Sequence, residues 1–498
     1  MNILIKNGFV FDSAGGKDQP AKQDILIANG SIAALGEEIP VSPTGNLEII
    51  DAADKLVIPG LVNSHLHSHD HFDRGRFENL PLELWILFIR PWIGAKPLTP
   101  RELYLRTIIG AMEMVRTGTT LAIDDVNLAP FNTPENLRAV MQAYRDVGMR
   151  ALVGASVFDK PAYQSVPYVE RLLPQAIRSA MDQTTKAEDW LVFLKDSLQA
   201  WSDPEGLTRF ILAPSAPQRC TDRLLVDLKK LAEDSGTLLM THTLETKVQK
   251  VTGQAFYGKS IIAHLEDLGV LGENLALVHC VWASDEDLDR IAVRGASVVH
   301  CPVSNLKLGS GVAPLEKMIQ RGIRIGLGTD NTSCNDSQNL FEVMKFAALL
   351  PKVRHGEFSH WPEAKDILRM ATAGGAGIAR LKGKIGMIEP GGNADLAILD
   401  LRTASFRPVG RIDRNLVFSE NGRSVTTAIV NGKVVLEDGK ITGVNESDLH
   451  REILEAAERL KKEHRSIYEK AQEIYPYFKE AYGRCHQEFA RLEREGKL

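Results

Sequence analysis

The sequence predicts an α/β fold in which a distorted TIM (β/α)8 barrel carries a small β-sandwich domain built from both termini and a C-terminal helical extension. Three observations support this prediction. Strand-like apolar runs alternate with helical stretches through the middle of the 498-residue chain, both flanking segments are rich in short strands, and the last segment is helical and charged. The length suits one large barrel plus an accessory module.

The small domain is predicted from residues 1–57 and 390–445. Both segments hold short β-prone runs separated by turns, and each contains an Asn-Gly pair between two such runs, Asn29-Gly30 and Asn431-Gly432. Asn-Gly is a strong signal for a two-residue hairpin because both residues tolerate positive φ. Since this pattern of short strands and turns lies on both sides of the middle of the chain, we expect one sheet domain assembled from two remote segments.

The barrel is predicted over residues 58–389, where strand-like and helical patterns alternate as in βα units. Each expected helix precedes a turn that leads into the next strand. The helices we expect are Pro100 to Arg116, Pro134 to Val147, Asp222 to Asp234, Asp285 to Val293 and Gln338 to Leu350.

The C-terminal tail, residues 446–498, is predicted to be helical. From Ile453 to Cys485 its apolar residues fall alternately four and three positions apart, which gives a heptad-like stripe in a charged helix. Pro476 interrupts the stripe and is expected to kink or split the helix. The stripe suits either packing on the chain's own barrel or a contact in an oligomer. We expect a homodimer or homotetramer.

Composition excludes several classes of partner. The 59 basic and 64 acidic side chains give a net charge of -5, which offers no basic surface for nucleic acid. No uncharged apolar stretch approaches the ~18 residues that cross a bilayer. The five cysteines are widely spaced with no Cys-x-x-Cys pair, as expected of reduced thiols in a cytoplasmic protein. The expected partner is a small-molecule substrate.

Ligand-type side chains follow four apolar runs that read as strands. They are His65 and His67, His242, His279 and Asp330. Parallel strands of an α/β barrel end on one face, so these remote residues can converge there. Neutral imidazoles and a carboxylate suit zinc or ferrous iron, and three or four protein ligands leave a position for water. A bound divalent metal lowers the pKa of that water to ~7.

Two further residues have open roles at this stage. Glu245 lies three residues after His242 and either carries a proton to the leaving group or is a solvated loop glutamate. His279 binds the metal or polarises the substrate from beside it.

At five strand ends the chain resembles the amidohydrolase superfamily, in the branch that holds the cytosine, guanine and methylthioadenosine/S-adenosylhomocysteine deaminases and the triazine hydrolases. The resemblance covers residues 1 to about 440. Its motifs are Pro59-Gly-Leu-Val-Asn-Ser-His-Leu-His67, Thr241-His-Thr-Leu-Glu-Thr246, Val278-His-Cys-Val-Trp282, His300-Cys-Pro-Val-Ser-Asn305 and Gly328-Thr-Asp330.

The resemblance implies one divalent metal, Zn²⁺ with Fe²⁺ as the alternative, held by His65, His67, His242 and Asp330. It implies three catalytic residues: Glu245 as proton shuttle, His279 beside the metal water, and Asp330 as the group that takes the water proton. No lysine ends the strand-4 candidate, so a second, carbamate-bridged metal is not expected. The implied reaction is attack of metal hydroxide on a C–N carbon of an aminated N-heterocycle.

Substrate contacts are expected from Trp85, Ser215, Trp282 and Asn305. Three departures from the nucleoside deaminases argue against a ribosylated purine. Arg90-Pro-Trp-Ile-Gly94 offers no carboxylate for ribose hydroxyls, Ser215 stands where those enzymes have a substrate-binding histidine, and the strand-6 motif ends in Trp282 instead of histidine. Ser215 and Trp282 look more like the triazine hydrolases.

Two alternative functions remain open. The same metal water can attack an amide or urea-type C–N bond or a heteroaryl C–Cl bond, and a relative that has lost its metal can act as a scaffold. The Ser68-His-Asp-His71 cluster is a further departure from the family: it binds substrate, binds a second metal or is a solvated loop.

Overall fold

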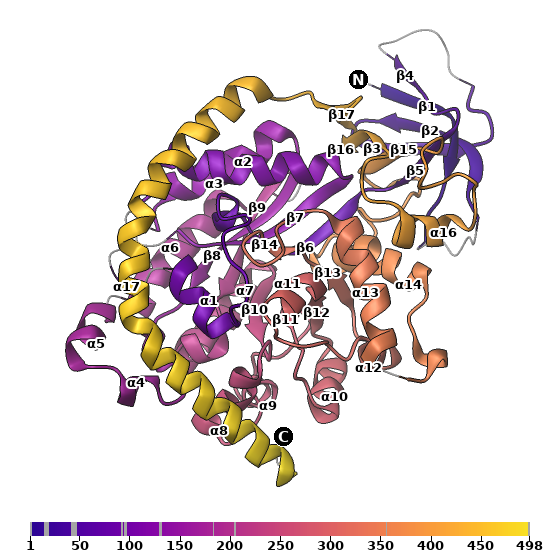
Figure 1. Ribbon diagram of the computed structural model, residues 1–498. Coiled ribbons are helices and arrows are strands. Elements are labelled where there is room, and N and C mark those ends of the chain that lie inside the picture. Colours follow the sequence, from indigo (N-terminus) through magenta and orange to yellow (C-terminus); the bar gives the residue numbers. More distant parts are fainter. Residues whose placement is uncertain are drawn as a thin grey trace.

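The computed structural model describes residues 2–496 except 14–18, 41–46, 91–92, 94–96, 129–131, 183, 204–205 and 355. Parallel strands form a curled sheet surrounded by helices, and a second sheet lies to one side of it (Figure 1). The predicted α/β architecture is confirmed.

The barrel sheet has the strand order β13-β12-β11-β10-β9-β8-β7-β6-β14, and all its pairs are parallel. β13 bonds to β12 and β14 bonds to β6, so these two short strands together fill the place of an eighth strand and bring the end of the sheet back to its start. The strands are β6 (Leu61–His67), β7 (Thr119–Val126), β8 (Arg150–Val157), β9 (Thr208–Pro214), β10 (Leu239–Thr243), β11 (Leu275–His279), β12 (Ser297–His300), β13 (Ile325–Leu327) and β14 (Asp330–Asn331).

The helices between these strands start and stop at the expected signals. Thr99 caps α2 with a full capping box, and Gly148 ends α3 with φ 78°. The helices of the barrel and its loops are α1 (Leu82–Ile89), α2 (Pro100–Arg116), α3 (Pro134–Val147), α4 (Val169–Leu172), α5 (Gln175–Met181), α6 (Ala187–Ala200), α7 (Asp222–Ser235), α8 (Lys247–Tyr257), α9 (Ile261–Asp267), α10 (Asp285–Arg294), α11 (Pro302–Lys307), α12 (Leu315–Gln320), α13 (Leu340–Arg354), α14 (Ala364–Arg369) and α15 (Gly375–Ile378).

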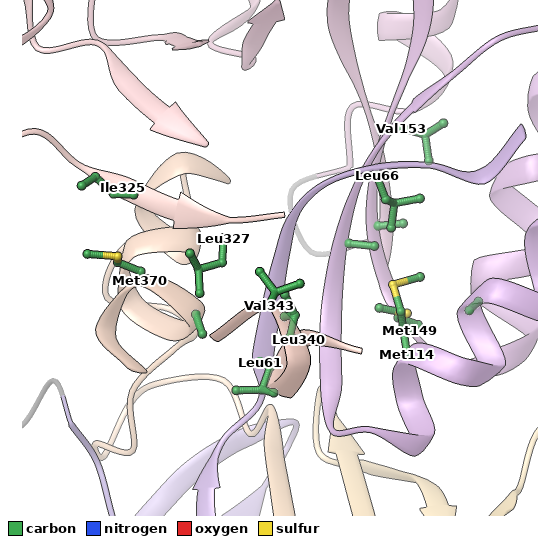
Figure 2. Packing of buried hydrophobic residues seen from close by; sticks show 14 of the residues in the cluster. Leu61, Leu66, Met114, Met149, Val153, Ile325, Leu327, Leu340, Val343 and Met370 are labelled. Atoms are coloured by element: carbon green, nitrogen blue, oxygen red, sulfur yellow. The ribbon is translucent and has the colours of Figure 1, made fainter. Parts of the chain in front are cut away.

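The main core lies between the outer face of the sheet and these helices. Leu66 of β6 and Met114 of α2 are fully buried in it, as are Leu327 of β13 and Val343 of α13 (Figure 2). Burial of such side chains stabilises the fold by roughly 1.5–3 kcal/mol each. This packing holds the strands rigidly, so the side chains at their ends have fixed positions.

The small domain is one mixed sheet in the order β18-β17-β16-β15-β5-β1-β2-β3, with β4 beside β1. β5 joins the N- and C-terminal segments, because it pairs in parallel with β1 and antiparallel with β15. Both Asn-Gly pairs lie in the predicted hairpins. The elements are β1 (Asn2–Val10), β2 (Ala21–Ala28), β3 (Ser31–Gly36), β4 (Leu47–Asp51), β5 (Lys55–Pro59), β15 (Leu396–Asp400), α16 (Ile412–Arg414), β16 (Val425–Val430), β17 (Lys433–Glu437) and β18 (Lys440–Ile441).

A buried ion pair fastens this sheet to the barrel. Arg150 begins β8, and its Nε donates to Oδ2 of Asp395 at 2.6 Å, while its Nη2 donates to Oδ1 of Asn431 at 2.7 Å. Both charged side chains are at most 5% exposed. Because the pair joins residues that are remote in sequence, it fixes how the two sheets lie relative to each other.

The C-terminal tail is a single helix, α17 (Glu446–Arg494), that runs along the outside of the barrel (Figure 1). The helix continues through Pro476, so the tail is not split there. Its apolar stripe is buried against the chain's own α1, α8, α2 and α4, which answers the open question between the barrel and an oligomer in favour of the barrel. No helix in the described part of the chain is long and apolar enough to span a membrane.

Candidate active site

Five polar side chains meet where the barrel strands end. His65 and His67 lie two residues apart on β6, and His242, His279 and Asp330 come from β10, β11 and β14. The backbone is strained at two of them, since His279 has φ 77° and Asp330 has φ 63°. Non-glycine residues with positive φ cost roughly 1–3 kcal/mol and concentrate at functional sites.

Three imidazoles point the same nitrogen at one another. Nε2 of His242 lies 3.1 Å from Nε2 of His67 and 3.2 Å from Nε2 of His65. The opposite nitrogens have acceptors: Nδ1 of His67 donates to the carbonyl oxygen of Asp125 at 2.6 Å, and Nδ1 of His242 donates to that of Ser215 at 2.6 Å. The proton of each of these two rings is therefore on Nδ1, and the Nε2 lone pairs face each other.

This arrangement fits a bound cation. Burial lowers the pKa of His65 and His67 well below their usual range and that of His242 to about 3, so the three rings are neutral. Neutral lone pairs at this separation repel unless a positive ion lies between them. Tetrahedral zinc with Zn–N bonds of about 2.0–2.1 Å places its nitrogens about 3.3 Å apart, which is close to the observed spacing.

Two carboxylates and one more histidine surround this cluster. Asp330 Oδ1 is 3.5 Å from Nε2 of His67, and its Oδ2 is 3.8 Å from Nε2 of His279. Glu245 Oε2 is 3.5 Å from the same His279 nitrogen. Nδ1 of His279 donates to Oδ1 of Asn305 at 2.9 Å, so Nε2 carries the lone pair of a neutral ring. Burial raises the pKa of both carboxyl groups, that of Glu245 well above its usual range.

A pocket opens from this cluster. It contains about 800 Å³ of empty space, part of it open to solvent. Its inner end is formed by side chains of the cluster, and its walls come from α1, from the segment after β9 and from α8. The residues that line it include Glu83, Arg90, Ser215, Arg219 and Glu245.

The expected substrate contacts occupy different places. Ser215 lines the pocket. Asn305 is buried behind His279, and Trp85 is buried in a small apolar cluster with Phe77 and Cys334. The indole of Trp282 donates to the carbonyl oxygen of Ser310 at 2.7 Å. None of these three is among the residues that line the described pocket, and their roles stay predictions.

The Ser68-His-Asp-His71 cluster is not a solvated loop, because all four residues are at most 8% exposed. Helix α2 covers them: Nδ1 of His71 donates to the carbonyl oxygen of Arg106 at 2.8 Å. Gly110 of α2 makes room for the His71 ring, which a Cβ at that position would overlap. Pro91, Trp92 and Gly94 of the stretch compared with the ribose-binding loop lie outside the described residues.

Sequence reasoning missed three pocket residues: Glu83, Arg90 and Arg219. Glu83 is 6% exposed; its Oε1 accepts from the Thr246 hydroxyl, and its Oε2 has no hydrogen-bond partner. Only the fold brings these residues to the metal end of the barrel, since they lie in loops and a short helix. Cys301 is buried beside His279 and Asp330.

The family model described as "Amidohydrolase family" matches residues 56–435. The chain belongs to this family. It is 32% identical over 92% of its length to a 5'-deoxyadenosine deaminase of Methanosarcina mazei, of which 98% is covered. It is 34% identical over 88% of its length to a 5-methylthioadenosine/S-adenosylhomocysteine deaminase of Thermococcus kodakarensis, of which 94% is covered.

Solved structures agree with this assignment. An adenosine deaminase from Xanthomonas campestris with bound zinc superposes with a TM-score of 0.82 at 26% identity, covering 92% of this chain and 98% of that one. An atrazine chlorohydrolase from Arthrobacter aurescens, complexed with zinc, gives a TM-score of 0.82 at 22% identity, covering 91% and 100%, which shows the common fold. The predicted amidohydrolase, a metal-dependent hydrolase of carbon–nitrogen bonds, is confirmed.

Proposed function

We propose that the protein is a zinc-dependent deaminase that replaces the exocyclic amine of an adenine nucleoside by a hydroxyl group. The observation that carries this proposal is the arrangement of His279, Glu245 and Asp330 around the open side of three converging imidazoles. Deaminases of adenine nucleosides are the relatives at 32–34% identity, and zinc is bound in a related structure.

Zinc held by His65, His67, His242 and Asp330 would act as a Lewis acid that lowers the pKa of a water molecule to about 7. The residues of the chain then manage two protons. Asp330 lies close enough to the cluster to accept the proton that the water loses. Burial and the nearby Asp330 raise the pKa of Glu245 well above its usual range, which favours the protonated carboxyl group.

A protonated Glu245 can donate to a ring nitrogen, then take the proton that the new C–OH group loses as the carbonyl forms, and deliver it to the departing amine. Asn305 fixes His279 in the tautomer whose Nε2 accepts a hydrogen bond. His279 therefore orients a water molecule or a developing hydroxyl group, while Asp330 accepts the proton that the water loses. The low exposure of all three groups strengthens these interactions, because water does not screen them.

Three departures of the sequence from the nucleoside deaminases argue against a nucleoside as the substrate. Glu83 bears on one of them: it is a buried pocket carboxylate with one free oxygen, and it comes from α1 instead of the loop after Trp85. A carboxylate oxygen without a partner can accept from a sugar hydroxyl. Ser215 and Trp282 still differ from the nucleoside enzymes, so binding of the base must use other groups.

The proposal is tested on protein loaded with one equivalent of Zn²⁺. Adenosine, 5'-deoxyadenosine and methylthioadenosine are assayed for loss of the adenine chromophore and for ammonia, with aminated triazines, a chlorotriazine and a urea as the alternatives. Ammonia release from the adenosines with a kcat/KM of at least about 10⁴ M⁻¹s⁻¹ supports the proposal. Turnover of only the triazines or the urea contradicts it. Oligomeric state and cellular location stay predictions.

A further inference from the structure

Two arginines line the active-site pocket without enough acceptors for their N–H groups. Arg90 follows α1 and Arg219 ends the short turn after β9, and they are 8% and 7% exposed. Both line the pocket that contains His67 and His242. The Nε of each is buried and has no hydrogen-bond partner. A guanidinium stays charged and has five donors, so an unmatched one in a buried wall is costly.

The contact between Arg90 and His69 does not give the guanidinium a hydrogen-bond acceptor. Nη2 of Arg90 lies 3.0 Å from Nε2 of His69. However, the backbone N–H of Asn127 donates to Nδ1 of His69 at 3.0 Å, so the ring proton is on Nε2. Oδ1 of Asp70 lies 3.3 Å from that Nε2. Arg90 therefore faces a donor, and its guanidinium has no acceptor among the described residues.

Arg219 is held in place but is also incompletely paired. Its Nη1 donates to the hydroxyl of Ser215 at 2.8 Å, and its guanidinium lies 4.4 Å from the centre of the Phe158 ring. Burial and the neighbouring charge of Arg90 lower the pKa of Arg219 to about 10, so two positive charges share one wall. The serine and the phenylalanine fix the position of this guanidinium and leave its other edge free.

The nearby negative charge does not balance the two arginines. Asp125 interacts with both guanidiniums, but the nitrogens within 4.0 Å of its carboxylate in the described structure belong to His67 and His242. Asp70 and Asp330 also interact with Arg90, but no carboxylate of the described residues forms an ion pair within 4.0 Å of either guanidinium. A further anion in the pocket would supply the acceptors that Arg90 and Arg219 lack.

We propose that Arg90 and Arg219 form an anion subsite that binds a carboxylate group of the substrate. Two guanidiniums offer parallel N–H pairs, which match the two oxygens of a carboxylate. The subsite is close to the reacting end of the pocket. Ser215, which holds Arg219, accepts from His242, and the ring of His69 lies 5.0 Å from that of His67.

The carboxylate therefore lies beside the heterocycle, on or next to the sugar, and an uncharged nucleoside would leave the subsite empty. The identity of the amine-bearing part rests on the proposed function; the anion subsite itself does not.

Calorimetric binding to the zinc-loaded protein tests the subsite with a matched pair of compounds, adenosine and adenosine 5'-carboxylate. The wild-type protein is expected to bind the carboxylate about 10- to 100-fold more tightly. Arg90→Met and Arg219→Met should each remove most of this preference, while Arg219→Lys should keep part of it. Arg223→Met is the control, because Arg223 is 80% exposed on α7.

Equal affinity of the wild-type protein for both compounds overturns the subsite. A preference that survives in both methionine variants also overturns it, because the carboxylate then binds the metal. If a methionine variant unfolds, as judged by its thermal midpoint, Arg90→Gln and Arg219→Gln replace it, since glutamine removes the charge and keeps a donor. Calorimetry measures binding and does not require turnover. A preference for the carboxylate without ammonia release refutes the proposed function but not the subsite. Ammonia release without that preference refutes the subsite but not the proposed function.

Discussion

Replacing Glu245 with glutamine removes the proton shuttle and changes little else. Glu245 is 3% exposed, and its backbone N–H donates to Oε1 of Gln249 at 2.6 Å, so its backbone is held by a group other than its own carboxyl. Glutamine has the same shape and can donate a hydrogen bond, but it cannot deliver a proton. Burial raises the pKa of Glu245 well above its usual range, which favours the uncharged form that glutamine resembles.

The size of the effect follows from these facts. A positioned general acid contributes roughly 10²- to 10⁴-fold to a rate. The Glu245 carboxyl is 4% exposed, so bulk water is a poor substitute for it, and we expect at least the middle of that range. A loss of about 10³-fold in kcat corresponds to about 4 kcal/mol of transition-state stabilisation at 1.36 kcal/mol per factor of ten.

Steady-state kinetics with an adenine nucleoside gives kcat and KM for the variant, and elemental analysis gives its zinc content, which should stay near one per chain. Glu83→Gln is the matched control: it makes the same chemical change in the same pocket, at a carboxyl group bonded to Thr246. It should raise KM and leave kcat within about fivefold. A Glu245→Gln variant that keeps more than a tenth of wild-type kcat with full zinc would refute the role of Glu245.

Three other predictions concern metal binding and stability. His242→Ala should lower bound zinc from about one to well below one per chain, as measured by elemental analysis after dialysis, because it removes one of three converging nitrogens. Arg150→Met should lower the free energy of unfolding by about 3–5 kcal/mol in urea titrations, because it leaves the buried Asp395 carboxylate unpaired. Phe478→Ala should cost about 3–5 kcal/mol, because this side chain is 1% exposed, whereas Leu454→Ala, at a position 68% exposed, should cost less than about 0.5 kcal/mol. Equal effects of the last two would contradict the packing of α17 on the barrel.

The metal ligands could be predicted from sequence because a strict geometric rule connects them. Strands of a parallel barrel end on one face, so a ligand directly after an apolar run has a known location without any knowledge of the loops. His242 lies one residue before the end of β10, and His279 is the last residue of β11. The hairpins of the small sheet were predictable for a similar reason, since Asn-Gly fixes a local backbone conformation.

The spacing of the apolar residues in the C-terminal helix does not show which surface covers them. A heptad-like pattern records that one side of a helix is buried, and it is the same whether the other surface belongs to the same chain or to another. The structure buries Phe478 and Ala481 against Leu84 of α1, and Cys485 against Val248 of α8. The helix thereby supports two elements that also form the pocket wall.

The pocket wall itself was beyond sequence reasoning because its chemistry depends on which atoms have partners. Arg90 in a sequence is a charged residue of a loop, and most such residues are solvated. Its lack of an acceptor follows only when the amide of Asn127 is seen to occupy Nδ1 of His69 and so to place the ring proton toward the arginine. The position of that proton depends on Asn127, His69 and Arg90, which the fold brings together. Where the fold is shared with many relatives, unmatched donors of this kind are the part of the site that records which substrate it binds.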